Sequence, residues 1–132
     1  MDIKGKKILI VDDEEDLCEI LQYNLGNEGY ITEIAHSAEE AIKRPLEDFD
    51  LILLDVMMGA VSGFKFADMI RKELKLDIPV IFLTALTDGA SRQMGELGGA
   101  DFIEKPFDPK DLAKKIEDVL KKIKGKSVSK KG

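Results

Sequence analysis

Residues 7–11 read KILIV and are followed at once by Asp12 and Asp13, while residues 50–55 read DLILLD and end in a further aspartate. Each stretch is an unbroken apolar run closed by carboxylates. A run of this length without polar alternation is typical of a strand that is buried on both faces, as central strands of a parallel sheet are. A third such run, PVIFLT, occupies 79–84. These three runs predict the centre of an α/β sheet.

Shorter strands and helical patterns fill the intervals. We expect strands also at 30–35 and 101–105, and helices at 14–27, from Ser37 to a stop at Pro45, at 63–75, at 88–97, and from Asp108 to Ile123. Strands that alternate with helices of this length form a parallel sheet with helices on both faces. Because the most apolar strands belong in the middle, we expect a doubly wound, flavodoxin-like sheet of five strands in the order 2-1-3-4-5, flanked by five helices.

The length and charge of the chain limit what it can be. Its 132 residues suit one domain, which we expect at 1–124, followed by a basic flexible tail or linker stub at 125–132. The net charge of −6 repels phosphate backbones, so we expect no direct nucleic-acid binding by the folded domain. Residues 121–132 hold six lysines, which we interpret as a solvated helix end and a frayed terminus.

The sequence also indicates a location in the cell. The apolar runs are strand-sized and too short to cross a bilayer, and no apolar segment of a secretory signal follows the N-terminal lysines. Cys18 is the only cysteine, so it forms no disulfide within the chain. We therefore expect a cytoplasmic protein without membrane partners, in which Cys18 fills space on a helix.

Chemically active side chains follow the predicted strands. Asp12 and Asp13 follow the first strand, Asp55 ends the third, Thr84 ends the fourth and Lys105 ends the fifth. The carboxyl ends of parallel strands meet at one edge, where such sheets bind their ligands. Taken singly, each residue is ordinary, since an acidic pair often just begins a helix and a lysine is usually solvated. Four coincidences at one edge favour a site.

Charge suggests what this site binds. Three neighbouring carboxylates repel one another, and a divalent cation removes that conflict. Oxygen ligands favour Mg²⁺, and a zinc set is missing because His36 is the only histidine and Cys18 the only thiol. The Asp55 carboxylate can attack phosphorus to form an aspartyl phosphate. Lys105 and Thr84 supply a charge and a hydroxyl for the phosphoryl oxygens.

These motifs resemble a known family. ILIVDDEED, DLILLDVMM followed by SG, PVIFLTA and GADFIEKPF occur in the order and near the spacing of the receiver domains of two-component response regulators, over about residues 5–123. The resemblance implies that Asp55 is the phosphoacceptor and that Asp13, Asp55 and the backbone carbonyl of Met57 bind Mg²⁺, with Asp12 acting largely through water. It implies that Thr84, Lys105 and the aromatic residue Phe102 form the phosphoryl-binding and switch set.

The resemblance also implies partners. A sensor histidine kinase or a phosphotransfer protein would supply the phosphoryl group. The face made by residues 88–97, the strand at 101–105 and the last helix would then bind an output partner, an effector domain outside this chain, or a second copy. Such a domain is a signalling phosphoacceptor that acts only on itself, not an enzyme.

Two departures from the family pattern stand out. Gly59 replaces a proline that many receivers have four residues after the acceptor, so the loop after Asp55 has more conformational freedom. The span from Thr84 to Lys105 is about one residue short and rich in glycine, which disfavours the helix at 88–97.

Other functions fit the residues less well. A phosphatase of the haloacid-dehalogenase type needs a second aspartate two residues after the first, where this chain has Met57. An FMN-binding flavodoxin needs a Ser/Thr/Gly-rich loop after the first strand, where five acids stand, and no glycine-rich nucleotide motif follows any strand. The alternative that stays open is a receiver-like interaction module that is not phosphorylated.

Overall fold

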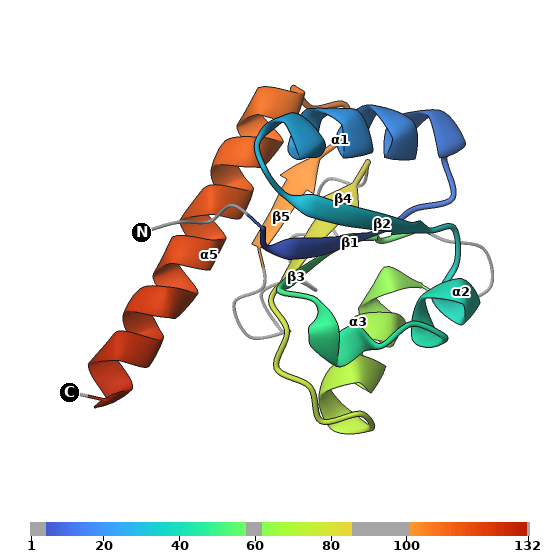
Figure 1. The fold of residues 1–132 in the computed structure, drawn as a ribbon. Helices are drawn as coiled ribbons and strands as arrows, with labels where there is room; N and C mark the ends of the chain where they lie inside the picture. The colour runs from blue at the N-terminus through green and yellow to red at the C-terminus, as the bar shows by residue number, and fades with distance from the viewer. Residues whose placement is uncertain (1–4, 58–61, 86–100, 132) are drawn as a thin grey trace.

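The computed structural model describes residues 5–57, 62–85 and 101–131. Its centre is a parallel sheet, shown in Figure 1. The strands are β1 (Lys7–Val11), β2 (Ile31–Ala35), β3 (Leu51–Asp55), β4 (Val80–Thr84) and β5 (Asp101–Glu104). They lie in the order β2-β1-β3-β4-β5, with every neighbouring pair parallel. The expected strand order is therefore confirmed, with β1, β3 and β4 in the middle.

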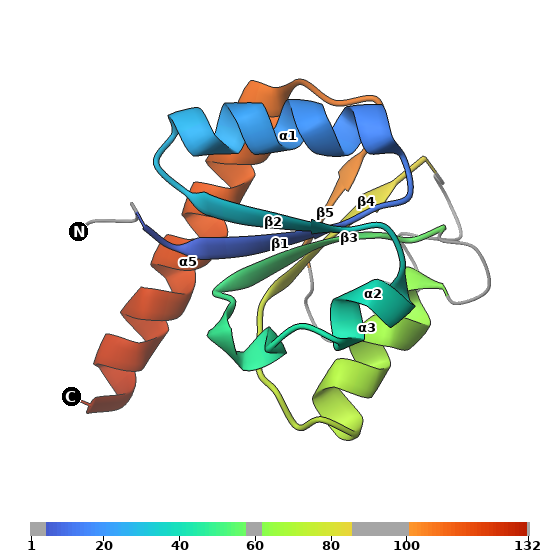
Figure 2. The same cartoon turned by 45° about the vertical axis from the view of Figure 1, so that its right-hand side comes forward.

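Helices cover both faces of the sheet. Figure 2 shows α1 (Glu15–Asn27) and α5 (Pro109–Lys131) on one face, and α2 (Ala38–Ile42) and α3 (Gly63–Lys72) on the other. A short 3₁₀ helix, Leu46–Asp48, leads from α2 towards β3. The helix expected at 88–97 lies outside the described residues.

The sheet separates two apolar layers. Leu51 and Leu53 of β3 pack into the layer beneath α1 and α5, while Ile52 and Leu54 pack into the layer beneath α2 and α3. All four side chains are fully buried. Because successive side chains of a strand point to opposite faces, only an unbroken apolar run can fill both layers. The run at 50–55 predicted this arrangement correctly.

Some helix ends differ from the sequence pattern. The helix expected at 63–75 ends at Lys72, because the chain turns through Lys75, which has a positive φ of 56°, and the Leu76 amide bonds back to the Ile70 carbonyl. The last helix continues past Ile123 to Lys131. The division into a domain at 1–124 and a tail at 125–132 stays a prediction.

Candidate functional site

The strand ends bring the expected side chains to one edge of the sheet. Ladder pairs link Val11 of β1 to Leu54 of β3 and Asp55 of β3 to Leu83 of β4. Thr84 at the end of β4 pairs in turn with Glu104 of β5. The residues that end or follow these strands are consequently neighbours in space, although they are far apart in sequence.

Three carboxylates form the centre of the site. Each of Asp12, Asp13 and Asp55 offers an oxygen within 4.8 Å of the other two. Asp12 is fully buried and Asp55 is 4% exposed, whereas Asp13 is exposed. The site is therefore a set of two buried acids beneath one that faces solvent.

Lys105 is the cation that faces these acids. Its Nζ lies 2.9 Å from Asp12 Oδ2, 3.1 Å from Glu14 Oε1 and 3.6 Å from Asp55 Oδ2. Burial opposes the charge on Lys105, but the hydrogen bond to Asp12 and the charges of Asp12 and Asp55 outweigh this effect, so the pKa of Lys105 is raised. One positive charge thus serves several carboxylates, and the site keeps a surplus of negative charge.

Backbone amides hold the two buried carboxylates in place. The Glu14 amide donates to Asp12 Oδ1 at 2.9 Å, and the Met57 amide donates to Asp55 Oδ1 at 3.1 Å. Both amides come from the loop that directly follows the acid's own strand. The orientation of each carboxylate is therefore set locally, before any ligand binds.

Burial and repulsion leave Asp55 hard to ionise. Desolvation first, and then the charge of Asp12, raise the pKa of Asp55 from 3.8 to about 6, against the lowering effects of the Met57 hydrogen bond and Lys105. A bound cation would relieve both causes. Because three hard oxygen ligands with excess negative charge suit Mg²⁺, the residues present fit that ion.

Gly63 allows the start of α3 to lie against the end of β3. The Gly63 amide donates to the Val56 carbonyl at 2.9 Å, which seats the start of α3 against the end of β3. A Cβ atom at Gly63 would lie only 2.2 Å from the Asp55 carbonyl oxygen. A side chain fits there only if the junction between β3 and α3 shifts, so the position of Asp55 depends on this glycine.

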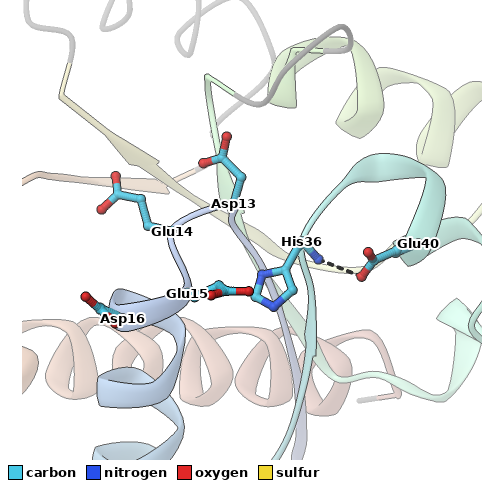
Figure 3. A pocket seen from close by; sticks show the side chains of 6 residues that line it. All are labelled: Asp13, Glu14, Glu15, Asp16, His36 and Glu40. Carbon is cyan, nitrogen blue, oxygen red and sulfur yellow. Dashed lines mark hydrogen bonds between the residues drawn. The ribbon is translucent and has the colours of Figure 1, made fainter.

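A hollow of about 660 Å³ opens beside Asp13. Figure 3 shows the side chains that line it. Its lining comes from the β1–α1 connection, the first turn of α1, the β2–α2 connection and α2, and consists of Asp13, Glu14, Glu15, Asp16, His36 and Glu40. The His36 amide donates to the Glu40 carboxylate at 3.0 Å (Figure 3, dashed line). The exposed side of the site is therefore strongly acidic, which attracts cations.

Comparison with known proteins decides the family. Residues 8–117 match the sequence family described as the response regulator receiver domain. The chain belongs to the response regulator receiver domain family. As a receiver domain it is a signalling phosphoacceptor rather than a catalytic enzyme.

Relatives of this receiver domain include longer regulators. The probable transcriptional regulator ycf27 of Cyanophora paradoxa is 43% identical over 131 residues, which are 98% of this chain and 54% of the relative. The alkaline phosphatase synthesis transcriptional regulatory protein PhoP of Bacillus subtilis (strain 168) is 40% identical over 120 residues, 89% of this chain and 50% of PhoP. The chain thus spans about half the length of these relatives.

Solved receiver domains share the fold. The non-phosphorylated HemR receiver domain from Leptospira biflexa superposes with a TM-score of 0.78 at 40% identity, covering 88% of this chain and 94% of that one. Chemotaxis protein CheY4 of Vibrio cholerae gives a TM-score of 0.79 at 30% identity, covering 87% and 98% respectively. The order of strands and the layers of helices are those of a receiver.

The receiver domain brings together most of the side chains that the sequence singled out. Asp12, Asp13, Asp55 and Lys105 meet in one cluster. Thr84 is buried at the end of β4, and its carbonyl accepts the Lys105 amide at 2.7 Å.

Two of the expected site residues, Phe102 and Met57, have side chains exposed to solvent. Phe102 is 39% exposed on β5, and the Met57 side chain is exposed while its amide bonds Asp55. Gly59 lies outside the described residues. The individual roles of the site residues stay predictions.

Sequence reasoning missed several residues of this site. Glu14 bonds Lys105, Gly63 supports Asp55, and both Cys18 and His36 bond the Asp12 backbone. The glycine in the SG pair after β3 was the one available signal for Gly63.

Within the described residues, no helix combines the length and apolar character that crossing a membrane requires.

Proposed function

We propose that this receiver domain accepts a phosphoryl group on Asp55 in a Mg²⁺-dependent reaction and thereby switches a partner-binding face. The observation that carries the proposal is the meeting of three carboxylates and Lys105 at the carboxyl ends of three strands, β1, β3 and β5. Asp55 is the acid that ends β3, at the switch point of the sheet. Its burial and the hydrogen bond from the Met57 amide favour one fixed orientation for attack.

The chain's own residues carry the transfer. A carboxylate oxygen of Asp55 bonds to phosphorus while the bond from phosphorus to the donor's nitrogen or oxygen breaks, and the leaving group takes a proton from solvent. The Met57 amide holds the other Asp55 oxygen, and Lys105 neutralises charge on the transferred group. Because phosphoryl transfer depends mainly on positioning and on charge neutralisation, these contacts supply what the reaction needs.

Mg²⁺ would be held by Asp13, Asp55 and the Met57 carbonyl, with Asp12 acting through water, and it would neutralise the charge of the phosphoryl oxygens. The fit rests on the surplus negative charge around Asp55, which Lys105 alone does not balance. Asp13 is the exposed member of the set and would be the ligand that an ion from solvent could reach most easily.

Phosphorylation then changes the surface. Thr84 turns towards the phosphoryl group, and Phe102 moves from its exposed position into the space behind it. Phe102 has no hydroxyl, so burial of its ring alone drives the inward state. The face that includes β5 and α5 is remodelled and binds an output partner, an effector domain or a second copy of the chain.

Partners follow from the family. Membership implies a histidine kinase, or a phosphotransfer protein, as phosphoryl donor in the cytoplasm. The relatives named as transcriptional regulators support an output in gene regulation through a part beyond the receiver, since this chain covers about half of their length. The net charge of −6 disfavours direct DNA contact by the receiver itself.

The proposal is tested by intact-mass analysis after incubation with acetyl phosphate, with Mg²⁺ or with EDTA. We expect a gain of one phosphoryl group that requires Mg²⁺ and is lost in Asp55→Asn. Asp50→Asn is the matched control, because Asp50 lies just before the other end of β3 and bonds the Lys7 amide. This control should be phosphorylated like the wild type.

A folded wild-type protein that gains no phosphoryl group from acetyl phosphate or from a cognate kinase would overturn the proposal. That result would favour the alternative, a receiver-like module that binds partners without phosphorylation. Phosphorylation that persists in Asp55→Asn would instead place the acceptor elsewhere.

A further inference from the structure

One backbone oxygen in the site accepts two side-chain hydrogen bonds. The Cys18 thiol lies 3.3 Å from the Asp12 carbonyl oxygen, and His36 Nδ1 lies 3.0 Å from the same atom. Cys18 comes from α1, and His36 follows the end of β2. Two separate elements therefore converge on the peptide that joins Asp12 to Asp13.

The chemistry of this contact fixes the direction of both bonds. A carbonyl oxygen only accepts, so the thiol donates its proton and His36 carries hydrogen on Nδ1. The oxygen has two lone pairs, and these two donors use both. The β1–β2 ladder ends at Val11 and Ala35, so the Asp12 carbonyl lies beyond the last strand pair.

A bond on this oxygen acts on the neighbouring acid. The peptide group is planar, and the Asp13 Cα lies in the same plane as the Asp12 carbonyl. Hydrogen bonds that fix the orientation of this carbonyl therefore also fix the position of the Asp13 Cα. Asp13 is exposed and belongs to the carboxylate set. Its backbone must be held by contacts made on the buried side, and Cys18 is fully buried there.

We propose that Cys18 and His36 are positioning residues for Mg²⁺ binding, which orient the Asp12–Asp13 peptide so that the Asp13 carboxylate faces the ion. This inference rests on the proposed function, because it assigns these two residues to the same Mg²⁺ site. They touch neither the ion nor the phosphoryl group. Their effect reaches the site through one peptide plane.

The test is Mg²⁺ binding measured by isothermal titration calorimetry, which needs no phosphorylation. Loss of a residue that directly supports a metal ligand weakens binding about 10- to 100-fold. Because these two residues act one step further away, we expect His36→Ala and Cys18→Ala each to raise the Kd for Mg²⁺ about three- to tenfold, near the value of one hydrogen bond.

Conservative variants should rescue binding. Asn places an amide N–H near the position of His Nδ1, and Ser replaces the thiol with a stronger donor. We expect His36→Asn and Cys18→Ser to bind Mg²⁺ within about twofold of the wild type, an interval well below the value of one hydrogen bond. Leu25→Val is the stability control, since Leu25 packs in the same apolar layer as Cys18. It should lower the urea midpoint without changing the Kd.

The outcomes separate the two proposals. Wild-type protein that binds Mg²⁺, with both alanine variants binding equally well, would overturn the positioning role and leave the proposed function intact. Wild-type protein that binds no Mg²⁺ would overturn both. His36 is only partly buried, so its alanine variant keeps the fold and gives a reading even if Cys18→Ala is poorly stable.

Discussion

At the scale of single residues, the site places two buried carboxylates next to a single lysine. Asp12 and Asp55 are both buried, and Lys105 is the shared cation that makes their burial tolerable. Removing one partner from a buried pair leaves an uncompensated charge, which is costly. Glu14 contributes little to this balance, because its side chain is 59% exposed and solvent screens the contact. The folded protein therefore keeps an excess of negative charge at the site, which a bound cation would reduce.

This arrangement predicts how stability depends on pH. The pKa of Asp55 is about 6 in the folded protein against an ordinary 3.8, so between these values the folded state binds more protons than the unfolded state. The stability that this group contributes below about pH 4 is lost as the pH rises through about 6. We expect Asp55→Asn to be more stable than the wild type at pH 7.5 in EDTA, and the difference to vanish near pH 4.

The measurement is urea unfolding followed by circular dichroism at several pH values. Asp50→Asn controls for loss of an aspartate from the opposite end of the strand and should show no such pH-dependent gain. Parallel stability profiles for the wild type and Asp55→Asn would contradict a raised pKa at Asp55.

At the scale of elements, the junction between β3 and α3 decides where Asp55 points. The Val56 amide donates to the Leu83 carbonyl, and the Gly63 amide donates to the Val56 carbonyl. α3 starts with Gly63 behind the cap of Ser62, whose hydroxyl accepts the Lys65 amide at 3.2 Å. The first residue of α3 therefore packs directly against the backbone of Asp55.

We predict opposite effects of alanine at two glycines. At Gly63 the new Cβ would lie 2.2 Å from the Asp55 carbonyl oxygen, so the junction must shift, at a cost of about 1–3 kcal/mol typical of overpacking. At Gly26 in α1, a Cβ meets nothing within 4 Å, and Ala should stabilise the helix by about 0.5 kcal/mol. Urea midpoints would check both signs.

The same pair tests the role of the junction in function. We expect Gly63→Ala to slow phosphorylation by acetyl phosphate, because Asp55 is displaced, while Gly26→Ala is phosphorylated at the wild-type rate. An equal rate for folded Gly63→Ala would mean that the junction tolerates the shift without moving the carboxylate.

At the scale of the whole molecule, the site brings together residues from segments that are far apart in the sequence. Lys105 and Asp12 are 93 residues apart in sequence, yet their hydrogen bond is 2.9 Å long. Four strands, β1, β3, β4 and β5, must be in register before the carboxylates and the amine meet. The site therefore exists only in the folded chain, and a ligand of this site stabilises the fold as a whole.

This coupling predicts that Mg²⁺ raises the free energy of unfolding. At a Mg²⁺ concentration ten times the Kd, the gain should be about 1.4 kcal/mol, and adding EDTA should reverse it. Asp13→Asn should lose most of the gain, because it removes the exposed ligand. NaCl at matched ionic strength is the control for screening. An equal gain in NaCl, or in Asp13→Asn, would show that the ion acts on charge in general and not at the acidic site.

The sequence by itself determined the sheet and the main site residues. Unbroken apolar runs mark strands with two buried faces, so β1, β3 and β4 could be placed in the centre without coordinates. Because the carboxyl ends of parallel strands share one edge, Asp12, Asp13, Asp55 and Lys105 could be expected together, and they are. Both inferences use only local pattern and connectivity.

Tertiary structure alone decided the contacts that support those residues. His36 reaches the Asp12 carbonyl across 24 residues, and the need for glycine at 63 appears only when α3 is seated against Asp55. The end of α3 at Lys72, before the turn through Lys75, and the exposure of Phe102 could likewise not be predicted from periodicity. Such details depend on which segments far apart in the sequence come into contact in the folded chain. The spacing of residues along the chain does not determine these contacts.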